Sequence, residues 1–252
     1  MKNFLIVGKG ICGKATGIIL HDNVDYHDPP KKEVVDDTSN YCFAFICVPT
    51  EITPSGTYDY TNVDEAVKQL KTTGFKGLIV IRSTCDPAYL QYLQDVYGSL
   101  VYWPEFLREA HFEHDATNPE NVVIGGTVEY TSVLVTLLKK QKHSSLCFWK
   151  STDIVSASII KLGLNSALAA KIAMFNSIKQ VCEIQGADWE TVRSTISNDS
   201  RIGNGQTMVP GHDKLRGFGG KCLPKDLSMF SKLAKENVYL DSIIQYNNKI
   251  RN

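Results

Sequence analysis

The stretch Phe4-Leu5-Ile6-Val7-Gly8-Lys9-Gly10-Ile11-Cys12-Gly13 decides the fold class of this chain. Its four apolar residues are typical of a buried strand, its glycines are typical of a tight turn, and small residues then continue with helical spacing to Leu20. A strand, a glycine turn and a helix in this order hold a pyrophosphate against backbone N–H groups at the start of the helix. We therefore expect a dinucleotide-binding turn formed by Gly8, Gly10, Ile11, Cys12 and Gly13.

An acidic residue follows the next expected strand, Val24 to His27, where it could contact the adenosine ribose of the dinucleotide. Asp28 lies 20 residues after Gly8, at the point where a Rossmann carboxylate accepts hydrogen bonds from the ribose hydroxyls. A carboxylate there repels a 2′-phosphate, so the sequence favours NAD over NADP. Two alternatives stay open: Asp28 is a turn residue before Pro29-Pro30, or Asp25 takes its role.

Short apolar runs alternate with helical patterns through the first part of the chain. Helices are expected at 62–72 and 131–140, and the further strands at 42–48, 77–81, 100–102, 122–124 and 146–148. This alternation predicts an α/β fold with a Rossmann-type, doubly wound and mainly parallel sheet. We expect an NAD-binding Rossmann domain at residues 1–149 and a helical dimerisation domain at residues 150–252.

One long helix dominates the second expected domain. Ser151-Thr152-Asp153 offers capping oxygens at its start, and Gly186 can end it after Gln185. At 1.5 Å per residue this helix is roughly 50 Å long. Because it is apolar on most sides, it must be covered by this chain or by a second copy, so we expect a homodimer. Shorter helices are expected at 187–196 and 223–235.

Composition excludes several functional classes. The 252 residues carry 27 basic and 27 acidic side chains without a basic block, so nucleic acid is not an expected partner. No apolar run approaches the roughly 20 residues that span a bilayer, and no signal peptide is expected. The seven cysteines lie mostly in apolar stretches and are typical of reduced thiols, which favours a cytoplasmic protein. No metal cofactor is expected.

The stretch Gly217-Phe218-Gly219-Gly220-Lys221-Cys222-Leu223-Pro224-Lys225-Asp226 is the best candidate for chemistry. Its glycines present Cys222 on a tight loop, and nearby lysines favour the thiolate, which is the nucleophilic form of the thiol. The alternative is a structural free cysteine beside a solvated pair of charges.

Lys161 and Asn165 lie four residues apart and so share one face of the long helix. Both are polar among apolar neighbours, and burying them is unfavourable unless they have partners. Beside a thiol, a lysine and an amide could polarise a hydroxyl and then stabilise an oxyanion. The alternative is a lysine that reaches the rim of the protein.

The ten-residue stretch around Cys222 resembles the nucleophile loop of the UDP-glucose/GDP-mannose dehydrogenase family. In that family the loop cysteine forms a thiohemiacetal and then a thioester while a sugar alcohol is oxidised to a carboxylate. The segment from Lys161 to Asn176 resembles the central helix of the same family. Residues 104–110 and 118–126 are similar to its NPEFLREG and NP-x-R-hydrophobic-IGG segments, although Trp103 replaces an asparagine and Ala110 a glycine.

Three further turns are similar to motifs of that family. Residues 47–50 resemble its CVPTP turn and Ser83-Thr84 its STVP turn, with departures at Glu51 and at Cys85-Asp86. Residues 199–203 resemble its DPRIG segment, whose arginine reaches the neighbouring subunit's active site. The resemblance therefore implies a homodimer in which Arg201 acts across the interface. The alternative is an ordinary surface arginine.

The resemblance also assigns roles to individual residues. It implies that Glu105 handles the water that attacks the thioester and that Thr84 binds a catalytic water. The implied catalytic residues are Cys222, Lys161, Asn165, Asp226, Glu105 and Thr84. The residues implied to line the cofactor, besides the glycine turn and Asp28, are Val48, Pro49, Thr50, Ser83 and Thr84. Those implied to bind substrate are Glu105, Phe106, Leu107, Arg108, Glu109, Lys161, Asn165, Arg201, Phe218 and Gly219.

The implied activity is NAD-dependent oxidation of a nucleotide sugar, expected to be UDP-glucose to UDP-glucuronate. Relatives continue into a third domain that grips the nucleotide, whereas this sequence stops at Asn252, so we expect a pared-down member of the family. One alternative is a short β-hydroxyacid dehydrogenase, which transfers a single hydride and needs no cysteine. The other is a catalytically silent NAD-binding scaffold.

Overall fold

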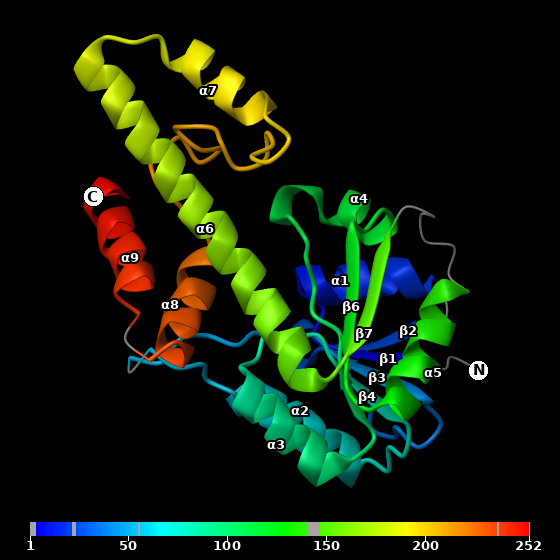
Figure 1. The fold of residues 1–252 in the computed structure, drawn as a ribbon. Coiled ribbons are helices and arrows are strands. Elements are labelled where there is room, and N and C mark those ends of the chain that lie inside the picture. The colour runs from blue at the N-terminus through cyan, green and yellow to red at the C-terminus, as the bar shows by residue number, and fades with distance from the viewer. Residues whose placement is uncertain (1–3, 22–23, 55, 141–146, 236, 252) are drawn as a thin grey trace. The chain divides into compact units, whose positions relative to one another are not determined.

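The computed structural model describes residues 4–21, 24–54, 56–140, 147–235 and 237–251. The chain divides into two compact units, Met1–Lys161 and Leu162–Asn252. The first unit therefore holds residues 150–161 as well as the segment expected to form the Rossmann domain. Figure 1 labels the elements used below.

The first unit is built on a seven-stranded sheet with the strand order β2-β1-β3-β4-β5-β6-β7. Neighbouring strands are parallel except for β5 and β6, which are antiparallel. The predicted α/β class with a mainly parallel, doubly wound sheet is confirmed. The strands are β1 (Phe4–Val7), β2 (Val24–His27), β3 (Phe43–Ile46), β4 (Leu78–Ile81), β5 (Leu100–Tyr102), β6 (Asn121–Gly125) and β7 (Phe148–Thr152).

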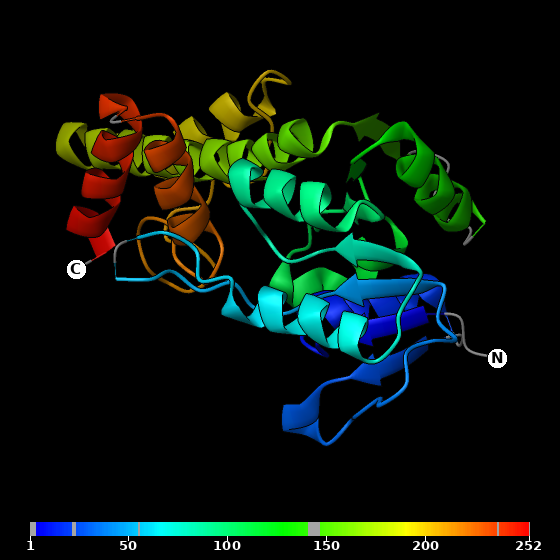
Figure 2. The same cartoon turned by 90° about the horizontal axis from the view of Figure 1, so that it is seen from below.

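Helices cover both faces of the sheet, as Figures 1 and 2 show. Side chains of β1 alternate between two hydrophobic cores, with Leu5 and Val7 in one and Phe4 and Ile6 in the other. The first core includes α2 (Thr61–Thr72), α3 (Pro87–Tyr97) and the start of α6 (Ile154–Gln185). The second includes α1 (Ile11–Leu20), α4 (Phe112–Thr117) and α5 (Val128–Lys139). Short 3₁₀ turns lie at Pro29–Lys31 and Glu109–His111.

Strand β7 is displaced from its predicted position. The strand was expected at 146–148, but it runs over Phe148–Thr152 and pairs in parallel with β6; Leu146 lies outside the described residues. The strand is at the sheet edge and is mostly exposed, so it lacks the apolar run on which the prediction depended. Helices α3 and α4 were not predicted.

The second unit is helical. It contains most of α6, together with α7 (Trp189–Asn198), α8 (Leu223–Leu233) and α9 (Val238–Arg251). Its core is formed by α6, α8, α9 and the loop before α8, through the buried residues Ala169, Ala173, Phe218, Leu227, Leu240 and Ile243. Helix α9 was not predicted, whereas α6 ends at Gln185 as expected, with Gly186 in the left-handed conformation (φ 70°).

Helix α6 corrects the expectation that no segment reaches membrane-spanning length. Over its 32 residues it is long and apolar enough to cross a bilayer by length and composition, although 44% of its most apolar window is buried. The core helix of a globular protein meets the same criteria. Its exposed apolar residues include Met174, Val181 and Ile184.

Candidate active site

The glycine turn after β1 has the shape that a dinucleotide needs. Gly8 is in the left-handed region (φ 92°), and a Cβ on Gly13 would lie 1.9 Å from the carbonyl oxygen of Gly8. The turn is therefore closely packed at these two glycines. Gly10, by contrast, caps α1 without a side-chain hydrogen bond, and a Cβ there would meet nothing within 4 Å. Uncapped N–H groups at Ile11 and Cys12 beside open space fit a pyrophosphate.

Asp28 is held at the carboxyl end of β2. Its Oδ2 accepts hydrogen bonds from the backbone N–H of Lys9, at 2.7 Å, and from Lys31 Nζ, at 2.9 Å. Burial opposes ionisation of Asp28, but these bonds outweigh it and keep the pKa of its carboxyl below the ordinary value. The rival Asp25 lies within β2 and accepts a hydrogen bond from the Tyr41 hydroxyl. Asp28 is thus the better placed acceptor for a ribose.

Two predicted cofactor-lining turns lie beside each other, after the adjacent strands β3 and β4. Ser83 Oγ donates a hydrogen bond to the carbonyl oxygen of Val48, at 2.6 Å, and Thr50 Oγ1 donates to that of Thr84, at 2.8 Å. Pro49 lies between Val48 and Thr50 on the same turn. These bonds bring the two segments together at the carboxyl ends of parallel strands, where α/β proteins bind their ligands.

The departure from the family motif at Cys85-Asp86 has a structural reason. Asp86 caps α3 by accepting hydrogen bonds from the backbone N–H groups of Ala88 and Tyr89. An aspartate before Pro87 starts this helix, because a side-chain oxygen there satisfies N–H groups that the helix cannot pair.

Lys161 and Glu105 form a buried ion pair in the first unit. Lys161 is 3% exposed, and its Nζ donates to the Glu105 carbonyl oxygen at 2.8 Å and to Oε1 at 3.0 Å. The other carboxylate oxygen accepts from the N–H of Leu107 at 2.7 Å. Burial raises the pKa of Glu105, but the charge of Lys161 and these bonds more than offset it, so the pKa lies below its ordinary value. Lys161 does not extend to solvent, contrary to the alternative of a rim lysine.

The other predicted substrate residues of this segment differ in exposure. Phe106 lies under the Lys161 ammonium, 5.5 Å from Nζ to the ring centroid. Arg108 is exposed, and its backbone N–H and guanidinium form three hydrogen bonds to Asp115; Glu109 is exposed as well. Their roles in binding substrate stay predictions.

In the second unit, Asp226 is held at the start of α8. Its side chain is completely buried, Oδ2 accepts from Asn165 Nδ2 at 2.6 Å, and Oδ1 accepts from Lys225 Nζ at 2.7 Å. Cys222 is the capping residue of α8 and is exposed, one turn before Asp226. The structure therefore brings Asn165 and Asp226 into direct contact and presents the Cys222 thiol at the start of α8.

The loop that carries Cys222 is held by residues that the sequence analysis missed. Asn247 of α9 accepts a hydrogen bond from the N–H of Phe218, at 2.7 Å, and donates one to its carbonyl oxygen, at 3.0 Å. Asn176 of α6 accepts from the N–H of Gly217. Phe218 itself is buried in the core, and a Cβ on Gly219 would lie 2.3 Å from Arg251. The available signal was Asn176, a polar residue on the mostly apolar predicted helix, whereas Asn247 lies on a helix that was not predicted.

Arg201 projects from the end of α7. Its side chain is 86% exposed and forms an ion pair with Asp199. A role across a subunit interface stays a prediction.

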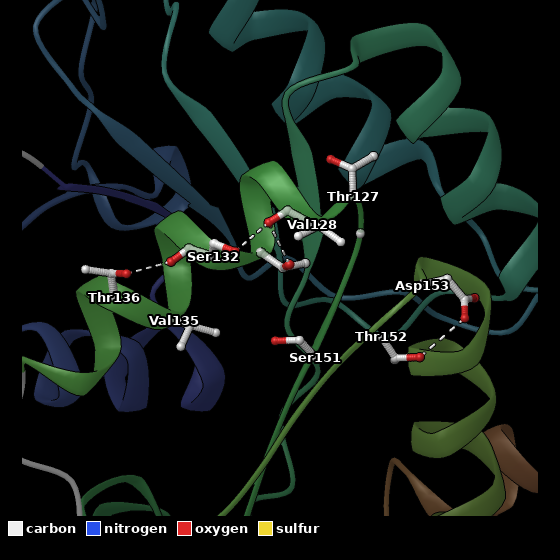
Figure 3. Close-up of a pocket in the computed structure, with 10 residues that line it drawn as sticks. Thr127, Val128, Ser132, Val135, Thr136, Ser151, Thr152 and Asp153 are labelled. Carbon is white, nitrogen blue, oxygen red and sulfur yellow. Dashed lines mark hydrogen bonds between the residues drawn. The ribbon is translucent and has the colours of Figure 1, made fainter.

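The sequence did not indicate a hollow of about 600 Å³, whose lining residues Figure 3 draws as sticks. It lies at the carboxyl ends of β6 and β7. Because β6 is antiparallel to β5, this is the edge of the sheet opposite to the glycine turn. Its polar lining consists of the hydroxyls of Thr127, Thr131, Ser132, Thr136, Ser151 and Thr152 and the carboxylate of Asp153. Among the residues that the structure describes, no group of three or more His, Cys, Asp or Glu side chains could hold a metal ion.

Sequence comparisons identify two domains of one family. Residues 31–142 match the profile of the UDP-glucose/GDP-mannose dehydrogenase family, NAD binding domain, and residues 155–251 match that of its central domain. Together the two matches cover most of the chain. They confirm the predicted resemblance and the NAD-binding assignment.

Two curated relatives are similar in sequence. The chain is 32% identical over 222 residues to the UDP-glucose 6-dehydrogenase TuaD of Bacillus subtilis, covering 82% of this chain and 46% of that protein. It is 33% identical over 216 residues to a UDP-glucose 6-dehydrogenase of Rickettsia bellii, covering 83% and 48%. The chain thus spans about half the length of the curated relatives it matches.

Solved structures agree on the fold. A UDP-glucose dehydrogenase from Pyrobaculum islandicum aligns with a TM-score of 0.83 at 21% identity, covering 99% of this chain and 68% of that one. A 3-hydroxyisobutyrate dehydrogenase from Mycobacterium tuberculosis aligns with a TM-score of 0.73 at 13% identity, covering 99% and 93%. At these identities the alignments establish the architecture alone.

Proposed function

Because the chain belongs to the UDP-glucose/GDP-mannose dehydrogenase family, we propose that it oxidises the C6 alcohol of a nucleotide sugar to the carboxylate in two NAD-dependent steps. The observation that carries this proposal is the start of α8, where an exposed thiol, Cys222, precedes a buried carboxylate, Asp226, that Asn165 holds. A single oxidation to an aldehyde would need no nucleophile, whereas a second oxidation proceeds readily from a covalent adduct.

The proposed oxidation of the alcohol to the acid has four steps. The alcohol loses a hydride and a proton to give an aldehyde, and the Cys222 thiolate then adds to its carbonyl carbon to form the anion of a thiohemiacetal. Loss of a second hydride gives a thioester, and water cleaves the thioester to release the acid and the thiol. NAD, when bound, supplies the hydride acceptor. One sugar therefore consumes two NAD and one water.

The residues of this chain have distinct roles in the proposal. Lys161 and Asn165, one turn apart on α6, stabilise the oxygen of the reacting carbon as it gains negative charge. A water held by Asp226 and Lys161 takes the hydroxyl proton. Glu105 and Asp226 activate the water that cleaves the thioester, with Thr84 as a further water ligand. The glycine turn, Asp28 and the turns at Val48–Thr50 and Ser83–Thr84 hold NAD.

We further propose UDP-glucose as the sugar nucleotide and a cytoplasmic homodimer as the working form. The names of the two curated relatives support the first. Seven free cysteines support a reducing compartment. The exposed apolar residues of α6 and the exposed Arg201 support a second copy of the chain that covers the helix and receives the arginine.

A second candidate is a β-hydroxyacid dehydrogenase that transfers one hydride. The shared fold is the observation behind it, because the chain aligns with the 3-hydroxyisobutyrate dehydrogenase structure with a TM-score of 0.73. Such an enzyme gives no role to Cys222. A catalytically silent NAD-binding scaffold is the third possibility.

The test is to count the NADH formed per sugar across a panel of nucleotide sugars, with UDP-glucose first. Two NADH and one acid per sugar support the proposal. One NADH per molecule of a β-hydroxyacid supports the second candidate, and NAD binding without turnover supports the scaffold.

The shared site has its own test, in which an Arg201→Ala chain is mixed with a Cys222→Ser chain. If Arg201 acts across the interface, the heterodimer has one site with both residues intact, and activity returns. A mixture that stays inactive although subunits exchange, or an active monomer by sedimentation, contradicts the shared site.

A further inference from the structure

A short turn after β2 places a lysine against the carboxylate that is expected to contact the cofactor. The turn, Pro29–Lys31, directly follows Asp28 at the carboxyl end of β2. Lys31 Nζ donates to Asp28 Oδ2 at 2.9 Å and to the backbone carbonyl oxygen of Lys9, in the glycine turn, at 2.6 Å. One ammonium group therefore joins Asp28 to the glycine turn.

The backbone holds Lys31 in this position. Pro29 and Pro30 precede it, and proline rings fix the φ angle. The N–H of Lys31 donates to the Asp28 carbonyl oxygen at 2.8 Å. Asp28 and Glu33 close the turn, because the N–H of each donates to the carbonyl oxygen of the other, at 2.7 and 3.3 Å. The side chain of Lys31 therefore extends from a backbone that hydrogen bonds fix on both sides.

The charges around Asp28 are balanced. Lys31 forms an ion pair with Asp28, and Lys9 forms one with Glu33 while its Nζ lies 4.5 Å from the ring centroid of Tyr26. The two carboxylates and the two ammonium groups of this cluster therefore sum to a formal charge of zero. Asp28 repels a 2′-phosphate less than an unpaired carboxylate would, because the ammonium group beside it attracts the same phosphate.

Lys31 keeps one hydrogen-bond donor for a ligand. An ammonium group has three N–H donors, and Lys31 gives two of them to Asp28 and to the Lys9 carbonyl oxygen. Among the residues that the structure describes, no third acceptor contacts its Nζ. The side chain of Lys31 is 48% exposed, whereas that of Asp28 is 11% exposed. A ligand that reaches Asp28 from solvent therefore meets the remaining N–H of Lys31, and lysine binds phosphate as a point charge.

We propose that Lys31 binds the 2′-phosphate of NADP beside Asp28, so that this site accepts NADP as well as NAD. The inference rests on the proposed role of the glycine turn and Asp28 in holding NAD. With NAD, a ribose hydroxyl donates to Asp28 Oδ1, which accepts no hydrogen bond from the described residues. With NADP, the phosphate accepts from the remaining N–H of Lys31. Lys31 is thus the residue that sets the preference between the two cofactors, which the carboxylate alone does not decide.

The test measures the affinities of NAD and NADP for the full chain by calorimetry, without a sugar substrate. Adenosine 5′-phosphate and adenosine 2′,5′-bisphosphate are measured as well, because these two ligands differ only in the 2′-phosphate. Lys31→Gln is the test variant. Lys32→Gln is the matched control, since it removes the same charge from the next position. Lys32 is exposed, and its side chain forms no hydrogen bond or ion pair with the described residues.

In the unmodified chain, NADP should bind with an affinity within about tenfold of that of NAD. Lys31→Gln should weaken NADP and the bisphosphate by about tenfold, and change NAD and the 5′-phosphate by less than about threefold. Lys32→Gln should change none of the four affinities by more than about threefold.

Three results would overturn the inference while NAD binding persists. The first is an NADP affinity in the unmodified chain that lies more than about tenfold below that of NAD. The second is an equal loss of all four ligands in Lys31→Gln, which would mean that Lys31 only holds Asp28 in place. The third is an equal effect of Lys31→Gln and Lys32→Gln. If the unmodified chain binds neither NAD nor NADP, the cofactor role under the proposed function fails, and this inference fails with it.

Discussion

Two glycine-rich loops, one before α1 and one before α8, each deliver a cysteine to the start of a helix, yet the two thiols have opposite surroundings. Cys12 is partly buried in the first turn of α1, whereas Cys222 is exposed. The glycines differ as well. Cβ atoms on Gly8 and Gly13 would meet backbone carbonyl oxygens, while Cβ atoms on Gly217 and Gly219 would meet the side chains of Asn247 and Arg251. The same local pattern therefore serves a packed binding turn in one unit and a loop held by side chains in the other.

The largest expected effect separates the two thiols by function. Cys222→Ser should abolish acid formation, by about a thousandfold or more, because the thioester cannot form. NAD binding should be unchanged, since the substitution leaves the glycine turn intact. Acid release and NAD affinity are measured on the same preparation, with Cys42→Ser, another exposed thiol, as the control. Acid release at the unmodified rate would remove Cys222 from the mechanism.

The next effect tests the packing of the first loop. Gly13→Ala places a methyl group against the Gly8 carbonyl, so we expect a loss of about 3 kcal/mol in the free energy of unfolding. Gly10→Ala is the matched control, because its methyl group meets open space and should leave stability within about 0.5 kcal/mol. Gly10→Ala should fold but bind NAD about tenfold more weakly or worse, because its methyl group fills the open space where the pyrophosphate is proposed to lie. Equal stabilities in urea unfolding would contradict the packed turn.

A smaller effect tests the clamp on the second loop. Asn247→Ala leaves the buried N–H and carbonyl of Phe218 without their partner, so we expect a loss of about 2 kcal/mol in the free energy of unfolding. Asn247→Asp retains the acceptor for the N–H and should lose less. If neither variant changes the denaturant midpoint, Asn247 does not hold the loop.

The smallest expected effect is a change in stability that depends on pH in the first loop and does not in the second. Asp28 binds the N–H of Lys9 in the first loop, and its pKa in the folded state lies below the ordinary value. The ionised Asp28 therefore adds to the free energy of unfolding at pH values above its pKa in the unfolded chain, about 4. This stabilisation is lost as the pH falls through its pKa in the folded protein. Asp28→Asn should cost under about 1 kcal/mol at pH 7 and nothing in strong acid.

The Asn247 clamp provides the contrast for that measurement, because an amide does not titrate. The loss caused by Asn247→Ala should be the same at pH 7 and at pH 4, as measured by urea unfolding at each pH. A pH-independent effect of Asp28→Asn, or a pH-dependent effect of Asn247→Ala, would remove the distinction between the two loops.

The fold could be predicted from the sequence where burial is strong. Strand β1 begins and ends where expected, because its four apolar residues are all buried and a glycine follows them. The sequence did not predict the elements whose positions depend on tertiary contacts. Strand β7 lies at the sheet edge and is mostly exposed, and α9 buries few side chains, so neither has a strong hydrophobic pattern.

Some residues of the candidate site could likewise be predicted from the sequence, and others could not. The sequence indicated Lys161 and Asn165, but not that Glu105 and Asp226 are their partners, since each pair joins residues more than 50 positions apart. Asn247 could not be identified at all, because its role depends on an unpredicted helix that packs against the loop. Local spacing shows which side chains share a face, and only the folded chain shows what they meet.

The dependence of the Cys222 loop on Asn247 also sets an order of events during synthesis. A ribosome releases the chain from its N-terminus, and the strands and helices of the first unit are complete by the time Lys161 has emerged. The thiol loop emerges soon afterwards, but its clamp comes later, on α9. The nascent chain therefore carries the complete first unit before the Cys222 loop is held in place, and an interruption of translation before residue 247 leaves a product whose loop lacks that clamp.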